Sequence, residues 1–170
     1  MSGQARSATE ITPGALFRVE DYRMCESMGY LIGRTKTALS MAIEQEVAQM
    51  DVTHSQASCL MLLANGRCQT ATDLGRELNT DIGSLTRMLS RMEKRGLIER
   101  ARSESDRRVV HLELTDAGRT LAERMPAIYT QVLNRFFAGF TQTEVQTLRG
   151  LLQRVLDNGT DAARMRPADA

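Results

Sequence analysis

Residues 82–95 read IGSLTRMLSRMEKR, and this stretch has two chemically different faces when it is drawn as a helix. At about 100° per residue its apolar side chains share one side, which predicts a face that packs in a core. That face comprises Ile82, Leu85, Met88, Leu89 and Met92. The opposite side combines short hydroxyl groups with long cations and has no carboxylate; it comprises Gly83, Ser84, Thr86, Arg87, Ser90, Arg91 and Lys94. Gly96 is the expected C-cap of this helix. The helix is therefore expected to pack through its apolar face and to offer hydrogen-bond donors on the other.

Two shorter helices are predicted before this stretch. Thr53 and Gln56 have the spacing of a capping box, in which each side chain satisfies a backbone N–H of the other residue. A helix therefore begins there and ends near residues 65–66. Thr70 offers a second N-cap, and the helix that it opens ends at residues 79–81.

A β-hairpin is predicted after the stretch. Residues 97–102 and 109–114 have the composition of strands, and the polar run 103–108 joins them. The second strand alternates, with Val110, Leu112 and Leu114 expected inward and Val109, His111 and Glu113 expected outward. We expect His111 to be solvated.

Long amphipathic helices flank this middle region. The apolar spacing predicts one helix from Tyr22 to about Gln49, another that Thr115 caps and Pro126 bends, and a third that opens at a Thr141/Glu144 capping box. The aromatic residues occur only in these terminal regions, which predicts a division into two lobes. The apolar faces are too long for the small middle lobe to cover, so we expect a homodimer held by its terminal helices.

Composition narrows the functional classes. The chain has 170 residues, 42% hydrophobic and 25% charged, which is ordinary for one globular domain. No window approaches about eighteen apolar residues and no signal peptide is recognisable, so we expect a cytoplasmic protein without a membrane span. The three cysteines, Cys25, Cys59 and Cys68, lack a C-x-x-C spacing and predict free thiols, with Cys59 an inert core residue.

Enzyme motifs are absent from the sequence. It contains no G-x-S-x-G, no Gly-rich phosphate loop and no H-E-x-x-H, and two histidines leave little acid–base chemistry. We therefore expect that the protein is not an enzyme and that it has neither a cofactor nor a metal site. The formal net charge is only +1, but residues 81–108 hold eight basic against five acidic residues. Arginine, which dominates that segment, suits recognition of phosphate and guanine.

The order of helix, short helix, polar-faced helix and basic-tipped hairpin is that of a winged helix-turn-helix. The run 84–100, followed by Asp106-Arg107-Arg108 and by LELTDAG at 112–118, resembles the MarR family of bacterial transcription regulators. The resemblance covers roughly residues 24–157. It implies a mainly α fold with a small β wing, and a homodimer that presents two winged helices to a pseudo-palindromic operator in double-stranded DNA.

The resemblance and the residues together give the candidate DNA contacts. The polar helix face enters the major groove, and the wing reaches the adjacent minor groove or phosphates. In the family the wing carboxylate orients a wing arginine, which implies that role for Asp106. The candidate contacts are Thr70, Gly83, Ser84, Thr86, Arg87, Ser90, Arg91, Arg102, Asp106, Arg107 and Arg108.

The family resemblance also implies an effector. Several members bind phenolic acids between the first, second and fifth helices, using a cation on the first helix and a polar ring at the start of the second. Arg34 and His54 match those positions, and Tyr30 lies one turn before Arg34. We therefore expect a repressor that a small aromatic acid or a similar drug-like compound releases; the alternative for Arg34 is a solvated helix residue.

Two other functions stay open. A peroxide-sensing repressor of the same family would use a thiol early in the first helix, where Cys25 lies about one turn too early and Glu26 disfavours the thiolate. A winged helix that binds protein would need an apolar recognition face, and this one is polar. The expected layout is a flexible segment at 1–21, one domain at 22–157 and a flexible tail at 158–170. Within the domain the winged helix is expected at about 52–114 and the dimerisation helices at about 22–49 and 115–157.

Overall fold

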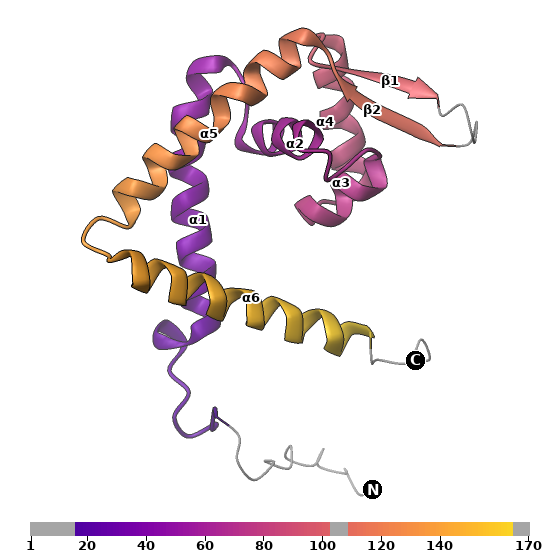
Figure 1. Cartoon of the computed structure of the whole chain (residues 1–170). Helices are drawn as coiled ribbons and strands as arrows, with labels where there is room; N and C mark the ends of the chain where they lie inside the picture. The colour runs from indigo at the N-terminus through magenta and orange to yellow at the C-terminus, as the bar shows by residue number, and fades with distance from the viewer. Residues whose placement is uncertain (1–15, 103–108, 165–170) are drawn as a thin grey trace, which may run out of the picture. The chain divides into compact units, whose positions relative to one another are not determined.

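The computed structural model describes residues 16–102 and 109–164, and in these ranges the chain forms six helices and one hairpin (Figure 1). Short 3₁₀ turns at Met24–Glu26 and Ala48–Met50 flank the first helix. The elements are α1 (Met28–Val47), α2 (His54–Ala64), α3 (Ala71–Leu78), α4 (Ile82–Lys94), β1 (Ile98–Arg102), β2 (Val110–Leu114), α5 (Asp116–Phe136) and α6 (Gln142–Arg164). The predicted fold class, mainly helical with a two-stranded wing, is confirmed. None of the described helices is long and apolar enough to cross a membrane.

The chain divides into two units, residues 1–41 and 42–170. In the first unit α1 begins at Met28 rather than at Tyr22, because Ser27 has extended backbone and its hydroxyl accepts the N–H of Tyr30 at 3.3 Å. Large apolar side chains of this unit, Met28 and Leu31 among them, stay exposed.

In the second unit, α2 and α3 have the predicted N-caps, and α4 has an N-cap that the sequence analysis did not name. Thr53 and Thr70 each form a complete capping box, and Asp81 accepts the N–H of Ser84 at 2.9 Å to cap α4. The core that these helices share consists of fully buried side chains, including Leu60, Leu74, Leu85, Leu89 and Met92. The helix α2 packs against α3, α5 and β2, and α4 packs against α3 and β1.

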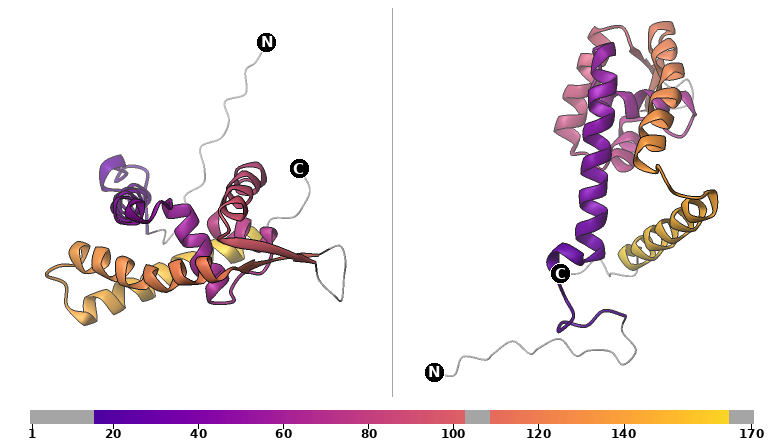
Figure 2. Two further views of the ribbon diagram at one scale, coloured as in Figure 1. Left: turned by 90° about the horizontal axis from the view of Figure 1, so that it is seen from above. Right: turned by 90° about the vertical axis from the view of Figure 1, so that its left-hand side faces the viewer.

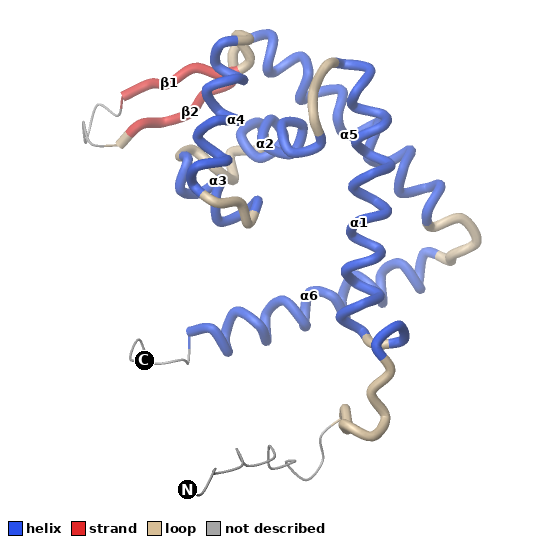
Figure 3. Tube along the Cα trace, turned by 180° about the vertical axis from the view of Figure 1, so that it is seen from behind, coloured by secondary structure: helices blue, strands red, loops and turns tan. Residues whose placement is uncertain are grey.

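The hairpin is antiparallel, with Ile98 opposite Leu114 and Arg102 opposite Val110. Figure 2 shows it projecting beyond α2, α3 and α4, and Figure 3 shows its two strands as the β-structure of the described residues. The N–H of Leu112 also donates to the carbonyl of Gln69 at 2.8 Å, which ties the segment before α3 to the sheet.

The predicted alternation of β2 is wrong at two positions. Val110 was expected inward but is exposed, because it pairs with Arg102 at the outer end of the hairpin, beyond the reach of the helices. His111 was expected to be solvated but is half-buried, and its Nδ1 is buried without a hydrogen-bond partner. The reason is that residues 66–69 lie along this face of β2 and line a cavity together with His111.

Both long C-terminal helices begin at their predicted caps. Thr115 caps α5, in which Met125 and Val132 are fully buried, and Thr141 with Glu144 forms the box that opens α6. The helix α6 extends past the predicted end at residue 157 to Arg164, so that part of the expected tail is helical. Its apolar residues are exposed: Leu148, Leu151, Leu152, Val155 and Leu156.

The start of α5 is held against the turn between α4 and β1. The N–H of Thr115 donates to the carbonyl of Leu97 at 3.3 Å, and the hydroxyl of Thr115 donates to the carbonyl of Gly96 at 2.5 Å. A Cβ at Gly118 would lie 1.9 Å from the carbonyl oxygen of Leu97, a distance that no side chain can adopt. Position 118 therefore requires glycine.

We expect Gly118→Ala to lower the free energy of unfolding by about 3 kcal/mol, because the backbone of α5 or of Leu97 must move. The matched control is Gly150→Ala in α6, where nothing lies within 4 Å of the added Cβ and helix propensity favours alanine by up to about 1 kcal/mol. Urea denaturation measures both variants. A Gly118→Ala protein as stable as the unaltered chain would contradict this close packing.

Candidate nucleic-acid interface

The polar face of α4 is a surface feature of the second unit. Gly83, Thr86, Arg87, Arg91 and Lys94 are exposed, while Ser84 and Ser90 are half-buried. The other face holds the helix through buried Leu85, Met88, Leu89 and Met92. The two-faced character of α4 is confirmed, and its cations are carried by a packed element.

The apolar face was wrongly predicted at one position. Ile82, expected in the core, has 69% of its surface exposed. It is the first residue of α4, and the close approach of α3 comes one turn later, where a Cβ at Gly75 would lie 3.4 Å from Cδ2 of Leu85. Ile82 therefore joins the exposed surface of the helix.

The first turn of α4 forms a small charged arrangement. Hydrogen bonds from the backbone and side chain of Ser84 hold the pKa of Asp81 below its usual range, and the Arg87 guanidinium contributes less. Arg87 donates to the Ser84 hydroxyl at 3.0 Å and so lies back along the helix. A Cβ at Gly83 would lie 3.3 Å from Oδ1 of Asp81 and 3.5 Å from Nη1 of Arg87, so it would crowd the capping carboxylate and make ordinary contact with the guanidinium.

Thr86 has less hydrogen-bonding capacity than its sequence suggested. Its hydroxyl donates to the Ile82 carbonyl at 2.7 Å, inside the helix. The oxygen can still accept a hydrogen bond, and the methyl group remains for apolar contact.

Two cations of the basic segment 81–108 form ion pairs within the protein. Arg95 binds the carboxylate of Asp51 at 3.0 Å and also donates to its carbonyl, which ties the end of α4 to the turn before α2. Arg100 on β1 lies 3.5 Å from the Glu93 carboxylate. The net positive charge of this segment is therefore concentrated at the remaining positions, which include Arg87, Arg91 and Lys94.

The wing is described only in part. Arg102, at the outer end of β1, is exposed, which suits a contact with DNA. Asp106, Arg107 and Arg108 lie outside the described residues, so their roles stay predictions.

Thr70 has the N-cap role that the sequence predicted, in addition to being a candidate DNA contact. Its hydroxyl accepts the N–H of Asp73 at 3.2 Å and donates to the Asp73 carboxylate at 2.7 Å. That hydrogen bond is the largest cause of the lowered pKa of Asp73. A DNA contact of Thr70 stays a prediction.

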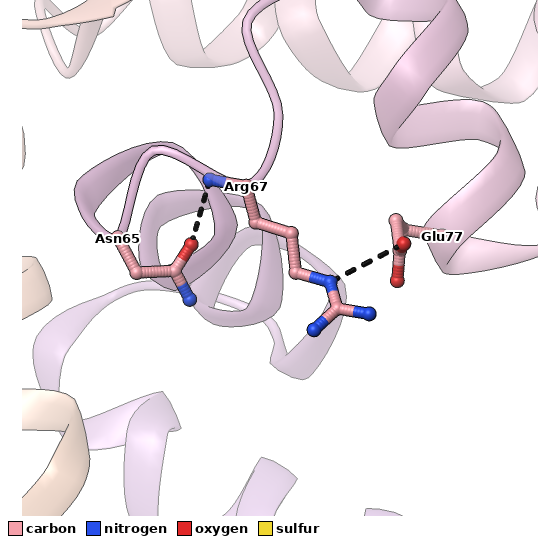
Figure 4. A network of polar contacts seen from close by, with 3 residues as sticks. All are labelled: Asn65, Arg67 and Glu77. Carbon is pink, nitrogen blue, oxygen red and sulfur yellow. Dashed lines mark hydrogen bonds and ion pairs between the residues drawn. The ribbon is translucent and has the colours of Figure 1, made fainter.

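A second polar arrangement, which the sequence did not reveal, lies at the turn between α2 and α3 (Figure 4). Nε of Arg67 lies 3.3 Å from the Glu77 carboxylate, and the backbone N–H of Arg67 donates to the side-chain oxygen of Asn65 at 3.0 Å. The two residues of the ion pair come from the turn and from α3, and a spacing of ten residues across a turn carries no recognisable signal. The network fixes the turn that precedes Thr70.

The predicted effector residues lie in both units. Tyr30, half-buried, and Arg34, exposed, are one turn apart on α1 in the first unit. His54 is the first residue of α2 in the second unit, where its N–H donates to the Glu44 carboxylate at 2.5 Å. Whether the three form one site stays a prediction.

Around His54 the structure adds two polar residues that the sequence analysis missed. The ring of Tyr129 on α5 lies 5.9 Å from the His54 ring, centroid to centroid, and its hydroxyl lies 3.2 Å from the Ser58 hydroxyl. Burial raises the pKa of Tyr129, so the phenol stays protonated at neutral pH. The interval of 71 residues between Ser58 and Tyr129 explains why spacing alone did not connect them.

The thiols differ in their environment. Cys25 is exposed, and both Cys59 and Cys68 are buried. Burial, with a smaller contribution from Cys68, raises the pKa of Cys59 to about 12. Burial is also the largest cause of the raised pKa of Cys68. Among the described residues, no group of three or more histidine, cysteine, aspartate or glutamate side chains is arranged to hold a metal ion.

Comparison with known proteins gives a consistent result. Residues 52–110 match the sequence model of the MarR family. The chain is 31% identical over 130 residues to the multiple antibiotic resistance protein MarR of Escherichia coli (strain K12), covering 76% of this chain and 90% of that protein. It is 42% identical over 76 residues to the organic hydroperoxide resistance transcriptional regulator of Bacillus subtilis (strain 168), covering 45% of this chain and 52% of that protein. The crystal structure of an E. coli MarR mutant complexed with operator DNA superimposes with a TM-score of 0.68 at 29% identity, over 75% of this chain and 92% of that one.

The difference in thiol environment predicts the order of alkylation. At pH 8 a thiol with a pKa of about 12 is ionised in roughly one molecule in ten thousand, and the thiolate is the reactive form. Iodoacetamide should therefore modify Cys25 in the folded protein and Cys59 only after denaturation, as peptide mass spectrometry measures. A Cys25→Ser variant serves as the control and should take up no label when folded. Rapid labelling of Cys59 in that variant would show that the α2 core is open.

Proposed function

Because the chain belongs to the MarR family of DNA-binding transcriptional regulators and is not an enzyme, we propose that it binds a pseudo-palindromic operator as a homodimer and acts as a repressor that a small aromatic acid releases. The observation that carries this proposal is the exposed face of α4, which bears Arg87 and Arg91 while the opposite face of the helix is buried in the core. Arginine can form two parallel hydrogen bonds to guanine in the major groove, and helices of this diameter fit that groove. The related E. coli protein has been crystallised with operator DNA.

The apolar surface of the C-terminal helices supports the dimer. Leu151, Val155 and Leu156 on α6 are each at least half exposed. A groove of about 550 Å³ between α5 and α6 is lined mainly by apolar side chains, including Phe137, Phe140 and Leu152. Soluble chains seldom leave such continuous apolar surface uncovered, and a second copy of the same helices would bury it.

The effector proposal rests on chemistry at two places. On α1, Arg34 can bind a carboxylate with two hydrogen bonds. In the second unit, the rings of His54 and Tyr129 can hold an aromatic ring. Release follows if the ligand prefers a dimer whose recognition helices are spaced incorrectly for DNA. A tenfold loss of DNA affinity requires a differential binding energy of only about 1.4 kcal/mol.

A second function has one observation in its favour. Cys25 is exposed, and the similarity to the hydroperoxide resistance regulator of B. subtilis makes a thiol-based sensor the alternative. That similarity spans 45% of this chain and 52% of the relative. DNA release by an organic hydroperoxide that is lost in Cys25→Ser would favour this alternative, whereas release by an aromatic acid in the same variant favours the first proposal.

DNA readout is tested with duplexes that the full chain enriches from a random library. Arg87→Ala or Arg91→Ala should cost about 1 to 3 kcal/mol on the enriched duplex and less on random DNA. Arg107→Ala or Arg108→Ala should weaken binding to all duplexes and reduce the salt slope by about one. Arg124→Ala, an exposed cation on α5, is the matched control and should change neither quantity. If the α4 variants lost affinity equally for all sequences, base readout by these residues would be refuted.

Effector binding is tested by titrating salicylate against the complex of protein and enriched duplex. Arg34→Ala should raise the half-maximal salicylate concentration at least about tenfold, because a paired carboxylate loses its cation. DNA affinity without salicylate should stay the same. Lys36→Ala, an exposed cation two positions further along α1, is the matched control. An unchanged half-maximal concentration in Arg34→Ala would remove this residue from the site.

A further inference from the structure

Ile82 stands out among the apolar residues of the second unit. In the described residues from Ala42 to Val132, Ile82 and Val110 are the large apolar side chains that stay exposed, and Ile82 is the more exposed of the two at 69%. The following apolar positions of α4 are almost inaccessible, with Leu85 at 1% and Leu89 at 2%. An exposed isoleucine at the end of an otherwise well-packed helix has no role in that core.

The position of Ile82 is fixed by its neighbours. Asp81 before it caps α4 through the N–H of Ser84, so the first turn is well ordered. The carbonyl of Ile82 accepts the hydroxyl of Thr86 at 2.7 Å. Because that hydroxyl is engaged within the helix, the methyl group of Thr86 is available beside the Ile82 side chain, four residues earlier on the same face.

Two arginines and one carboxylate flank this apolar spot. The carboxylate is that of Asp81, directly before Ile82, and it is engaged in capping the helix by accepting the N–H of Ser84. Arg87 lies back along the same turn on Ser84, Gly83 adds no side chain, and Arg91 follows one turn later. A protein partner with an apolar surface would have to desolvate these guanidinium groups. The phosphates of duplex DNA would pair with them, so charge complementarity favours DNA as the occupant.

The major groove offers one apolar group that fits such a spot. Thymine carries a C5-methyl group at the groove surface, and no other standard base does. Recognition helices of this type contact base edges mainly through their N-terminal residues, which is where Ile82 lies. We propose that Ile82, with the methyl group of Thr86, packs on the C5-methyl of one thymine in each half-site and makes the protein select thymine there. This inference rests on the proposed DNA-binding function and adds a specificity determinant to it.

The experiment uses the full chain and the duplex that it enriches from a random library. Each thymine of one half-site is replaced in turn by deoxyuridine, which removes only the methyl group, and fluorescence anisotropy gives the dissociation constants. For the unaltered chain, the replacement of one particular thymine in that half-site should weaken binding about fourfold, which is the factor for a single buried methyl group. Replacement of any other thymine should have little effect.

The variants Ile82→Ala and Ile82→Val complete the test. Ile82→Ala should bind the thymine and deoxyuridine duplexes at that position equally, whereas Ile82→Val should keep most of the preference. Thermal unfolding should show that both variants are folded, since the side chain is exposed. The deoxyuridine series with the unaltered chain does not depend on either variant.

The outcomes separate this inference from the proposed function. If the chain enriches no sequence, DNA-specific binding itself fails. If it enriches a sequence whose half-sites lack thymine, or if every deoxyuridine replacement is without effect, the thymine contact is overturned while DNA binding stands. An Ile82→Ala variant that retains the full methyl preference would overturn the role of Ile82.

Discussion

The contact between the Leu97 backbone and the start of α5 is the constraint on which the rest of the second unit depends. At this junction α4 has just ended, with Gly96 at a φ of 67°, and β1 begins two residues after Gly96, at Ile98. The hydroxyl of Thr115 caps α5 by accepting the N–H of Gly118 and also donates to the Gly96 carbonyl. The recognition helix, both ends of the wing and the long helix α5 therefore meet at four residues, and the missing side chain at Gly118 allows the approach.

This junction gives the proposed regulation a physical route. The helix α5 carries Tyr129 beside His54 at one point along its length and meets the end of α4 at its own start. A ligand that displaces α5 near Tyr129 would act on the helix whose start packs on Leu97, and closely packed elements transmit displacement. Pro126 lies between these two points and removes one backbone hydrogen bond of the helix. A second contact at the end of α4 is the ion pair between Arg95 and Asp51, which joins α4 to the segment before α2. The C-terminal end of the recognition helix is thus held in two ways by groups that lie outside its DNA-facing surface.

Local signals in the sequence predicted most of this architecture. The N-caps at Thr53, Thr70 and Thr141 lie where each hydroxyl and its carboxamide or carboxylate partner three positions later indicated. Thr115 caps α5 through its hydroxyl alone, since residue 118 is glycine. The errors have a common origin in tertiary context. Ile82 and Val110 satisfy the periodicity of a buried face but lie beyond the edge of the core, and the cover over His111 comes from residues distant in sequence. The polar face of α4 could be predicted from the sequence. The hydrogen bonds that the Thr86 hydroxyl donates to the Ile82 carbonyl and the Thr70 hydroxyl donates to the Asp73 carboxylate could not, because they depend on rotamers that periodicity does not determine. Both bonds alter what these side chains can offer DNA.

The central claim is that two copies of the α4 surface bind one duplex side by side. Hydroxyl-radical footprinting of the enriched duplex with the full chain tests it most directly, because the reagent reports backbone protection at single-nucleotide resolution. A dimer should leave two protected stretches per strand whose centres lie about 10 base pairs apart, one for each recognition helix. A single protected stretch, or uniform protection along the duplex, would contradict it.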